Sequence, residues 1–261
     1  LILYLPADGL YLDPTLPGTP MGYVPAHVAG QMAFVLDGTQ ESPRRLPEQG
    51  GDANRVYEEL AWSPAGADSY RLRGSLLLTG ELAFAFRASG ADPVADRERL
   101  ERTLARLYPQ IDINTEGLEA SFSTRKGLPV LTIRFEGSDP VSCRVLSDGG
   151  PDRSARRCAG FARDPLGIVE QITGSPRPLV FTYHGSYTLP TLPSEAIDRL
   201  PRYRREALPG AMLRLTSAVS DRTVTVKVVH RRSQRQLSEE DLDALRRAWD
   251  ETPDVVQWRL R

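Results

Sequence analysis

The stretch AMLRLTSAVSDRTVTVKVVHRR, Ala211–Arg232, is followed by LSEEDLDALRRAWDE, Leu237–Glu251. Apolar and polar residues alternate along 223–230, which is typical of a strand with one buried face. Ser220-Asp221-Arg222 interrupts the apolar pattern, so two strands are expected to form a hairpin. Ser238 can cap a helix whose first turn is acidic and whose apolar residues recur every three or four positions. The sequence therefore predicts a hairpin followed by an amphipathic helix.

Working outward, residues 179–188 are predicted to form a strand, 194–207 a helix interrupted by Pro201, and 255–260 a last strand. With the hairpin and the final helix, this order is β-α-β-β-α-β, the ferredoxin-like arrangement. We therefore expect a ferredoxin-like module over 176–261.

A looser copy of this strand order is expected about 95 residues earlier. It consists of a strand over Leu82–Phe86, a helix over Asp92–Tyr108 that Pro109 ends, and a hairpin of 118–122 with 130–135. The predicted fold class is therefore α+β, with two modules of β-α-β-β type that form a diverged repeat. Residues 1–140 form the first module, 141–175 a connector that contains both cysteines, and 176–261 the second.

Three further segments complete the expected secondary structure. Ala26–Leu36 is predicted as a short buried helix, and Gln40–Asn54 as an exposed loop because it is polar and rich in proline and glycine. Pro165–Ile172 is predicted as a short helix, while the periodicity of Val56–Trp62 does not decide between strand and helix.

The formal net charge of the chain is −1, but the charge is unevenly distributed. Residues 1–140 hold 13 Lys+Arg and 19 Asp+Glu, a net of −6, and residues 141–261 hold 20 and 15, a net of +5. This asymmetry either directs the two halves toward different partners or reflects two ordinary surfaces.

The two cysteines, Cys143 and Cys158, flank a turn signal at Asp148-Gly149-Gly150-Pro151. We expect them to form a disulfide, which would place the protein outside a reducing cytosol; the alternative is two unpaired buried thiols. The chain begins at Leu1 instead of methionine, so a signal peptide or lipid anchor could have been removed. Its apolar runs are shorter than the 18 or so residues that a membrane-spanning helix needs, so no membrane span is predicted.

Two groups of residues are weak candidates for catalysis. His184 and Ser186 lie in FTYHGSYT, and a histidine–serine pair can perform nucleophilic catalysis if a carboxylate orients the imidazole. Asp112, Glu116 and Glu119 form an acidic group that suits sugar hydrolysis or calcium binding. A structural histidine and a solvated acidic loop explain the same residues. The three histidines, His27, His184 and His230, have no metal-ligand spacing, so no metal or cofactor is expected.

Basic residues gather at Arg202, Arg204 and Arg205 and again at Arg231 and Arg232. Such clusters can contact a phosphate backbone. Arginine is also ordinary at the end of a helix or hairpin, so we do not expect nucleic acid as the partner on these grounds.

The opening LILYLPADGLYLDPT resembles the first two strands of GerM-like sporulation and germination domains. The later ERLERTLARLYPQIDINTEGLEASFSTRKGLPV is similar to their helix, central strand and hairpin end. The resemblance covers about residues 1–135 and fits 38–60 poorly. It implies a small α+β module of the ring-building kind found in bacterial envelope assemblies, with no catalytic residues to transfer.

These observations predict a non-enzymatic binding or assembly module of a bacterial envelope or secreted protein. Its location would be periplasmic, lipid-anchored or secreted, and its partner another protein or a second copy of itself. A hydrolase with its site near His184 or Asp112 and Glu116 is the first alternative. A nucleic-acid-binding protein that uses the basic C-terminal half is the second.

Overall fold

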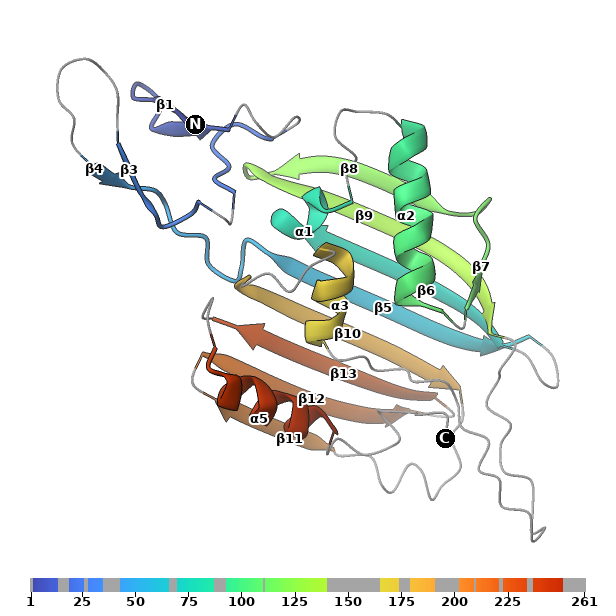
Figure 1. Cartoon of the computed structure of the whole chain (residues 1–261). Helices are drawn as coiled ribbons and strands as arrows, with labels where there is room; N and C mark the ends of the chain where they lie inside the picture. The colour runs from blue at the N-terminus through green and yellow to red at the C-terminus, as the bar shows by residue number, and fades with distance from the viewer. Residues whose placement is uncertain are drawn as a thin grey trace, which may run out of the picture.

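The computed structural model describes residues 2–13, 19–25, 28–34, 43–65, 70–86, 93–109, 111–139, 165–173, 179–190, 202–208, 210–220, 223–233 and 237–250. The protein is a mixed α+β structure with a core that is mostly sheet. Its centre is a nine-stranded sheet in the order β11-β12-β13-β10-β5-β6-β9-β7, in which β8 also pairs with β9 (Figure 1). Two hairpins, β1–β2 and β3–β4, precede the sheet in the chain.

The strands of the large sheet are β5 (Arg55–Pro64), β6 (Tyr70–Thr79), β7 (Asp112–Ile113), β8 (Glu119–Arg125), β9 (Leu128–Asp139), β10 (Phe181–Pro190), β11 (Tyr203–Leu208), β12 (Ala211–Ser220) and β13 (Thr223–Arg232). The two small hairpins consist of β1 (Leu3–Leu5), β2 (Leu10–Leu12), β3 (Met32–Phe34) and β4 (Pro43–Arg45). The helices are α1 (Glu81–Phe84), α2 (Pro93–Leu107), α3 (Pro165–Thr173) and α5 (Glu239–Asp250).

One strand pair joins the two halves of the chain. β5 and β10 run parallel, with Tyr57 beside His184 and Glu59 beside Ser186, whereas every other strand pair in the sheet is antiparallel. Parallel neighbours need a long connection, and here most of the N-terminal half of the sheet lies between them in sequence. A single sheet therefore contains strands from both 1–140 and 176–261.

All four described helices cover the same face of the sheet (Figure 1). Apolar side chains of the strands alternate toward this face, and a continuous buried cluster joins them to helix residues such as Leu104, Ile168 and Leu245. Polar side chains alternate toward the other face, which no described helix covers. We call this second surface the open face. Among the described residues, no helix has the length and apolar character required to cross a bilayer.

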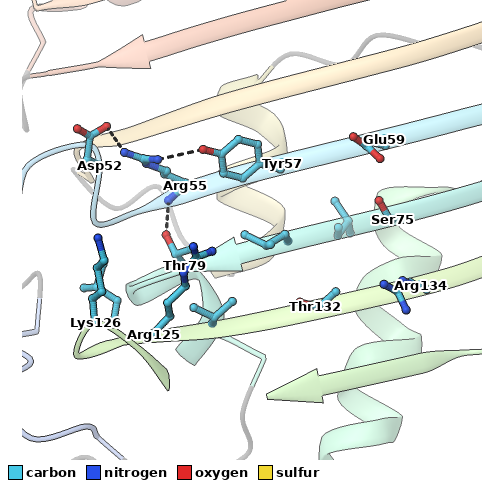
Figure 2. Close-up of a pocket in the computed structure, with 14 residues that line it drawn as sticks. Asp52, Arg55, Tyr57, Glu59, Ser75, Thr79, Arg125, Lys126, Thr132 and Arg134 are labelled. Atoms are coloured by element: carbon cyan, nitrogen blue, oxygen red, sulfur yellow. Dashed lines mark hydrogen bonds and ion pairs between the residues drawn. The ribbon is translucent and has the colours of Figure 1, made fainter. Parts of the chain in front are cut away.

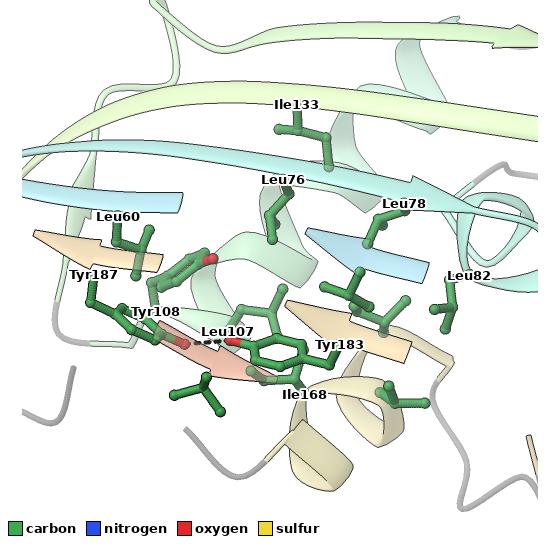
Figure 3. Close-up of a cluster of buried hydrophobic side chains, with 14 of the residues drawn as sticks. Leu60, Leu76, Leu78, Leu82, Leu107, Tyr108, Ile133, Ile168, Tyr183 and Tyr187 are labelled. Carbon is green, nitrogen blue, oxygen red and sulfur yellow. Dashed lines mark hydrogen bonds between the residues drawn. The ribbon is translucent and has the colours of Figure 1, made fainter. Parts of the chain in front are cut away.

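Glu58 on β5 is a buried carboxylate beneath the helices. Its oxygens accept hydrogen bonds from the hydroxyls of Tyr108 at 2.6 Å, Tyr183 at 2.5 Å and Tyr187 at 2.6 Å. Figure 3 shows Tyr183 and Tyr187 reaching toward one another from β10, and their hydroxyls are also hydrogen-bonded. A Cβ atom on Gly185, the residue between them, would lie 2.7 Å from the Tyr183 hydroxyl. Glycine therefore leaves the space in which the tyrosines reach Glu58.

Several predicted elements are present. They include the helix now seen as α2, the hairpin β8–β9, the helix α3, the strand β10, the hairpin β12–β13 and the helix α5. The expected cap of α5 is also confirmed, because the Ser238 hydroxyl accepts a hydrogen bond from the Asp241 backbone N–H at 3.1 Å. For α2, α5 and the two hairpins, the apolar pattern agreed with the turn or capping residues.

Two predictions near the N-terminus are wrong. Met32–Phe34, expected within a buried helix, is strand β3, paired with β4. The segment expected as an exposed loop over Gln40–Asn54 contains β4 and ends at a buried residue, Asn54. The Asn54 side chain accepts a hydrogen bond from the Glu81 backbone N–H at 2.8 Å and donates one to the Val180 carbonyl at 3.1 Å. Its burial follows from these long-range partners, which local composition does not reveal.

The prediction of a strand over Leu82–Phe86 is also wrong, because this segment contains most of the helical turn α1. Gly80, with φ of 63°, redirects the chain after β6, and Leu82 and Ala83 pack into the core. Short apolar runs fit a strand or a buried helix equally well. The proposed repeat, which used this strand, loses that correspondence.

Tyr203–Leu208, expected as the end of a helix, is strand β11, which pairs with β12. Pro201 and Pro209 closely bracket the segment, and proline disfavours helix for the residue before it. The order β10-β13-β12 agrees with part of the predicted C-terminal module. Residues 191–201 and 251–261 lie outside the described residues, so the ferredoxin-like arrangement stays a prediction.

Replacing Ser238 with alanine is expected to lower the free energy of unfolding by about 1 kcal/mol, because an N-terminal backbone donor of α5 loses its acceptor. Urea denaturation of the variant and of the wild-type protein measures this difference. Ser121→Ala, at an exposed position on the edge strand β8, is the matched control and should change little. Equal losses in both variants would contradict a capping role for Ser238.

Candidate functional site: the open face of the sheet

The pairing register sets which side chains meet on the open face. Across the middle of the sheet one row contains Thr132, Leu77, Tyr57, His184 and Val229, contributed by β9, β6, β5, β10 and β13. The same register places Ser and Thr side chains in the neighbouring rows. The open face is thus a broad surface rich in hydroxyl groups.

Charged side chains on this face are mostly basic. The basic positions are Arg55, Arg71, Arg73, Arg125, Arg134, Arg205, Arg214, Lys227 and Arg231. The acidic positions are Glu59, Asp112, Glu119 and Glu136. Two of these acids are already paired, since Arg73 lies 3.0 Å from Glu136 and Arg134 lies 3.8 Å from Glu119. Nine basic against four acidic positions leave a net charge of +5 on the open face, although the whole chain is close to neutral.

Four of the basic residues form a compact group, which we call the basic cluster: Arg205, Arg214, Lys227 and Arg231. Arg205 on β11 is directly opposite Arg214 on β12. Lys227 and Arg231 on β13 flank Val229, the residue opposite Arg214, and so lie diagonally from Arg214. Directly opposed Cβ atoms are about 5 Å apart and diagonal ones about 7–8 Å. No described acidic side chain is opposite or diagonal to Arg214.

This arrangement has an energetic cost. Like charges directly opposite each other on a sheet are destabilising. Even in water, two unit charges about 5 Å apart repel by on the order of 1 kcal/mol. All four side chains of the basic cluster are exposed, so solvent and salt screen part of this repulsion. An anion lying over the cluster would convert the repulsion into attraction.

His184, the catalytic candidate, lies on the open face with its ring stacked on Tyr57. The ring centroids are 4.8 Å apart and the planes differ by 9°. Partial burial lowers the pKa of His184, and the positive charges of Arg55 and Arg214 lower it further. A neutral imidazole stacked on a phenol ring suits a structural or ligand-stacking role.

Ser186 does not meet His184 in a catalytic geometry. It lines a hollow of 730 Å³ together with Glu59, and His184 is not among the residues that line this hollow. Within the described part of the chain, no hydrogen bond joins the His184 ring to Ser186 or Glu59. The serine, histidine and carboxylate therefore share a face without forming the relay that nucleophilic catalysis requires.

The acidic candidates are distant from this histidine. Asp112 on β7 pairs with Ser138 on β9, so β5, β6 and β9 separate it from the strand of His184. Glu116 lies in the turn that follows β7, and its backbone N–H bonds the Asn114 side chain. Among the described residues, no three His, Cys, Asp or Glu side chains are placed to hold a metal ion.

The predicted arginines separate between the two faces. Arg205 and Arg231 join the basic cluster, whereas Arg232 faces the helix-covered side, where burial lowers its pKa. Arg202 lies exposed just before β11, and the side chain of Arg204 is outside the described part. Cys143, Cys158 and His27 also lie outside the described residues, so the disulfide stays a prediction.

Sequence reasoning missed Arg214, Lys227, Arg55 and Tyr57 as members of the site. A signal was present, because Arg214 alternates with the apolar residues Leu213 and Leu215 in the same way that Lys227 alternates with Val226 and Val228. That alternation assigns each residue to a face. It does not show that two basic positions from different strands are opposite each other, because the register depends on pairing.

Compared with protein families and with curated proteins, the chain matches no family model and no curated sequence.

Proposed function

We propose that this chain is a non-enzymatic binding protein that holds an extended, phosphate-bearing polymer on the open face of its sheet. The observation that carries the proposal is the basic cluster, in which Arg205 and Arg214 face each other without a described acid beside them. Closely spaced like charges favour a ligand that supplies several anionic groups.

The shape of the surface favours a polymer over a single small anion. Basic side chains extend from β11 through β12 and β13, and reappear at Arg55 on β5 and Arg125 on β8. Neighbouring strands are about 4.8 Å apart, so an extended chain lying across them meets basic groups over a length of several strands. Hydroxyl groups such as those of Thr216 and Ser186 lie between them and can donate hydrogen bonds to phosphate oxygens.

The same charge disfavours self-association through this face. A two-fold contact would place the basic cluster of one copy against that of another. Assembly with a protein partner, which the sequence and the GerM-like resemblance suggest, would therefore use another surface. A location outside the cytoplasm remains part of the proposal, supported by the spacing of Cys143 and Cys158. A mass measurement under non-reducing and reducing conditions tests it, since two free thiols would contradict it.

Charge reversal of Arg214 to glutamate is expected to weaken polymer binding roughly tenfold or more, because one phosphate contact becomes a repulsion. The same change is expected to raise the thermal midpoint, since a glutamate there would be opposite Arg205. Fluorescence anisotropy with labelled oligothymidylate and with labelled inorganic polyphosphate measures binding, at salt concentrations from about 50 to 200 mM.

Arg102→Glu is the matched control, because it makes the same change of charge at an exposed site on α2, across the sheet. It should leave binding nearly unchanged. Binding of only one of the two polymers would identify the source of the phosphate groups. The proposal fails if neither polymer binds at low salt, or if Arg102→Glu weakens binding as much as Arg214→Glu does.

A further inference from the structure

A hollow of 660 Å³ lies on the open face at the end of the sheet where β5, β6 and β9 meet the β8–β9 turn (Figure 2). Its volume falls within the range of about 300–1,000 Å³ that is common for small-molecule sites. The basic cluster lies on other strands, β11, β12 and β13, and contributes no residue to this hollow. The hollow is therefore separate from the basic cluster, although Arg55 and Arg125 also belong to the path of basic residues proposed for the polymer.

The lining of the hollow combines an apolar floor with the aromatic side chain of Tyr57. Leu77 and Val130 contribute apolar surface on a face that is mostly polar, and Leu128 extends it toward the turn. The phenol ring of Tyr57 stands beside this floor and is held in place by its stack with His184. A ligand with an apolar or aromatic body would bury this surface.

The rim of the hollow is basic. The Arg55 guanidinium donates a hydrogen bond to the Tyr57 hydroxyl at 3.0 Å and pairs with Asp52 at 2.8 Å, which fixes its position. Its Nε atom is buried and has no hydrogen-bond partner among the described residues. Arg125 and Lys126 complete the rim, and neither forms an ion pair within the described part. Two cations without a described ion-pair partner, beside the anchored Arg55 guanidinium, fit an anionic group.

Lys126 has an unusual backbone conformation. Lys126, with φ of 52°, and Gly127, with φ of 74°, form the two-residue turn between β8 and β9. Such turns favour asparagine or glycine at both positions. Lys126 is the one described residue other than glycine with a positive φ. Backbone strain retained beside a lined hollow is common where a side chain has a functional role.

We propose that this hollow binds a small organic anion. Its phosphate or carboxylate group would lie among Arg55, Arg125 and Lys126, and its apolar or aromatic body would cover Leu77 and Val130 beside Tyr57. This site takes a ligand with one charged end, whereas the basic cluster takes a chain of charges, so each can exist without the other.

Titration calorimetry with 1-naphthyl phosphate tests the site, with inorganic phosphate and 1-naphthol as separate probes of the head and the body. The wild-type protein is expected to bind 1-naphthyl phosphate at least roughly tenfold more tightly than either part alone. Lys126→Asn is expected to weaken this binding severalfold while raising the thermal midpoint, because asparagine accepts the positive φ more readily. A purely structural lysine would show the second effect without the first.

Two further variants complete the test. Leu77→Ser removes part of the apolar floor at a partly exposed position. It should weaken the binding of 1-naphthyl phosphate more than the binding of inorganic phosphate. Arg214→Glu should leave 1-naphthyl phosphate binding unchanged while it weakens polymer binding, which separates this site from the proposed function. Absence of 1-naphthyl phosphate binding in the wild-type protein overturns the inference, as does unchanged binding in Lys126→Asn or an equal loss in Arg214→Glu.

Discussion

Replacing Glu58 with alanine is expected to lower the free energy of unfolding by about 3–5 kcal/mol, because buried tyrosine hydroxyls lose an acceptor and a cavity remains. The carboxylate accepts hydrogen bonds from Tyr108, Tyr183 and Tyr187, so its loss removes an acceptor from three buried hydroxyls, of which those of Tyr183 and Tyr187 still share the hydrogen bond between them. Each unsatisfied buried group costs about 1–3 kcal/mol, and the residual cavity adds to this.

The charge state of the tyrosines supports this expectation. Burial raises the pKa of Tyr183 well above its ordinary value, and the neighbouring charge of Glu58 raises it further. The hydroxyl therefore remains protonated and donates to the carboxylate. Three hydrogen bonds to the Glu58 side chain compensate for removing it from water.

Urea denaturation of Glu58→Ala and Glu59→Ala measures this effect with a closely matched control. Glu59 is the next residue along β5, but its side chain is exposed on the open face, so its loss should change stability by no more than about 0.5 kcal/mol. Glu58→Gln should fall between the two, because an amide keeps one acceptor oxygen. Similar losses for Glu58→Ala and Glu59→Ala would show that the three tyrosines find other partners.

Glu58 also illustrates what could be predicted from the sequence. Along β5 the buried positions are Val56, Glu58, Leu60 and Trp62, so an acidic residue occupies an apolar phase of the strand. That anomaly is visible in the sequence once the segment is assigned as a strand. The partners are not visible, because the hydrogen bond from Tyr183 spans 125 residues and depends on the parallel pairing of β5 with β10.

Elements with agreeing local signals were predictable, and those decided by long-range pairing were not. The helix α5 has a cap, an acidic first turn and an apolar stripe, and all three indicate the same boundaries. Tyr203–Leu208 has no such agreement, and it forms a strand because β12 supplies a partner. Strand pairing satisfies backbone hydrogen bonds and can override a weak local preference.

The candidate site shows the same difference between features set by local sequence signals and features set by long-range strand pairing. Arg205 and Arg231 were identifiable as basic residues in a basic half of the chain, but their meeting with Arg214 and Lys227 depends on register. A shift of one residue would move Arg214 to the buried face. The open face is formed by nine paired strands. It therefore cannot be recognised within a single segment, as a sequence motif can.

The free energy of unfolding is expected to fall as the pH is lowered from about 7 to 4. Replacing His230 with leucine is expected to make this fall smaller by about 3 kcal/mol. His230 on β13 is 2% exposed, and its ring stacks on Phe181 with the centroids 5.3 Å apart. Burial, followed by the charge of Arg232, lowers the pKa of His230 from 6.5 to about 4. A difference of this size corresponds to about 3 kcal/mol between the two protonation states.

The sign follows from proton binding in the two states. Between pH 6.5 and about 4 the unfolded chain binds a proton at His230 and the folded protein does not, so this group's contribution to stability is full above pH 6.5 and is lost as the pH falls to about 4. Carboxylates titrate in the same range, but they do so equally in wild type and variant. The difference between the two pH profiles therefore isolates His230.

Urea denaturation at a series of pH values from about 7 to 4 checks this, with His184→Gln as the comparison. Partial burial also lowers the pKa of His184, but its ring lies on the open face, so its replacement should flatten the profile less than His230→Leu does. Parallel profiles for the wild-type protein and His230→Leu would mean that the folded protein accommodates a charged imidazole at this position. That result would contradict a closed core between β13 and the helices, because such a core offers the imidazolium neither water nor a described hydrogen-bond partner for Nε2.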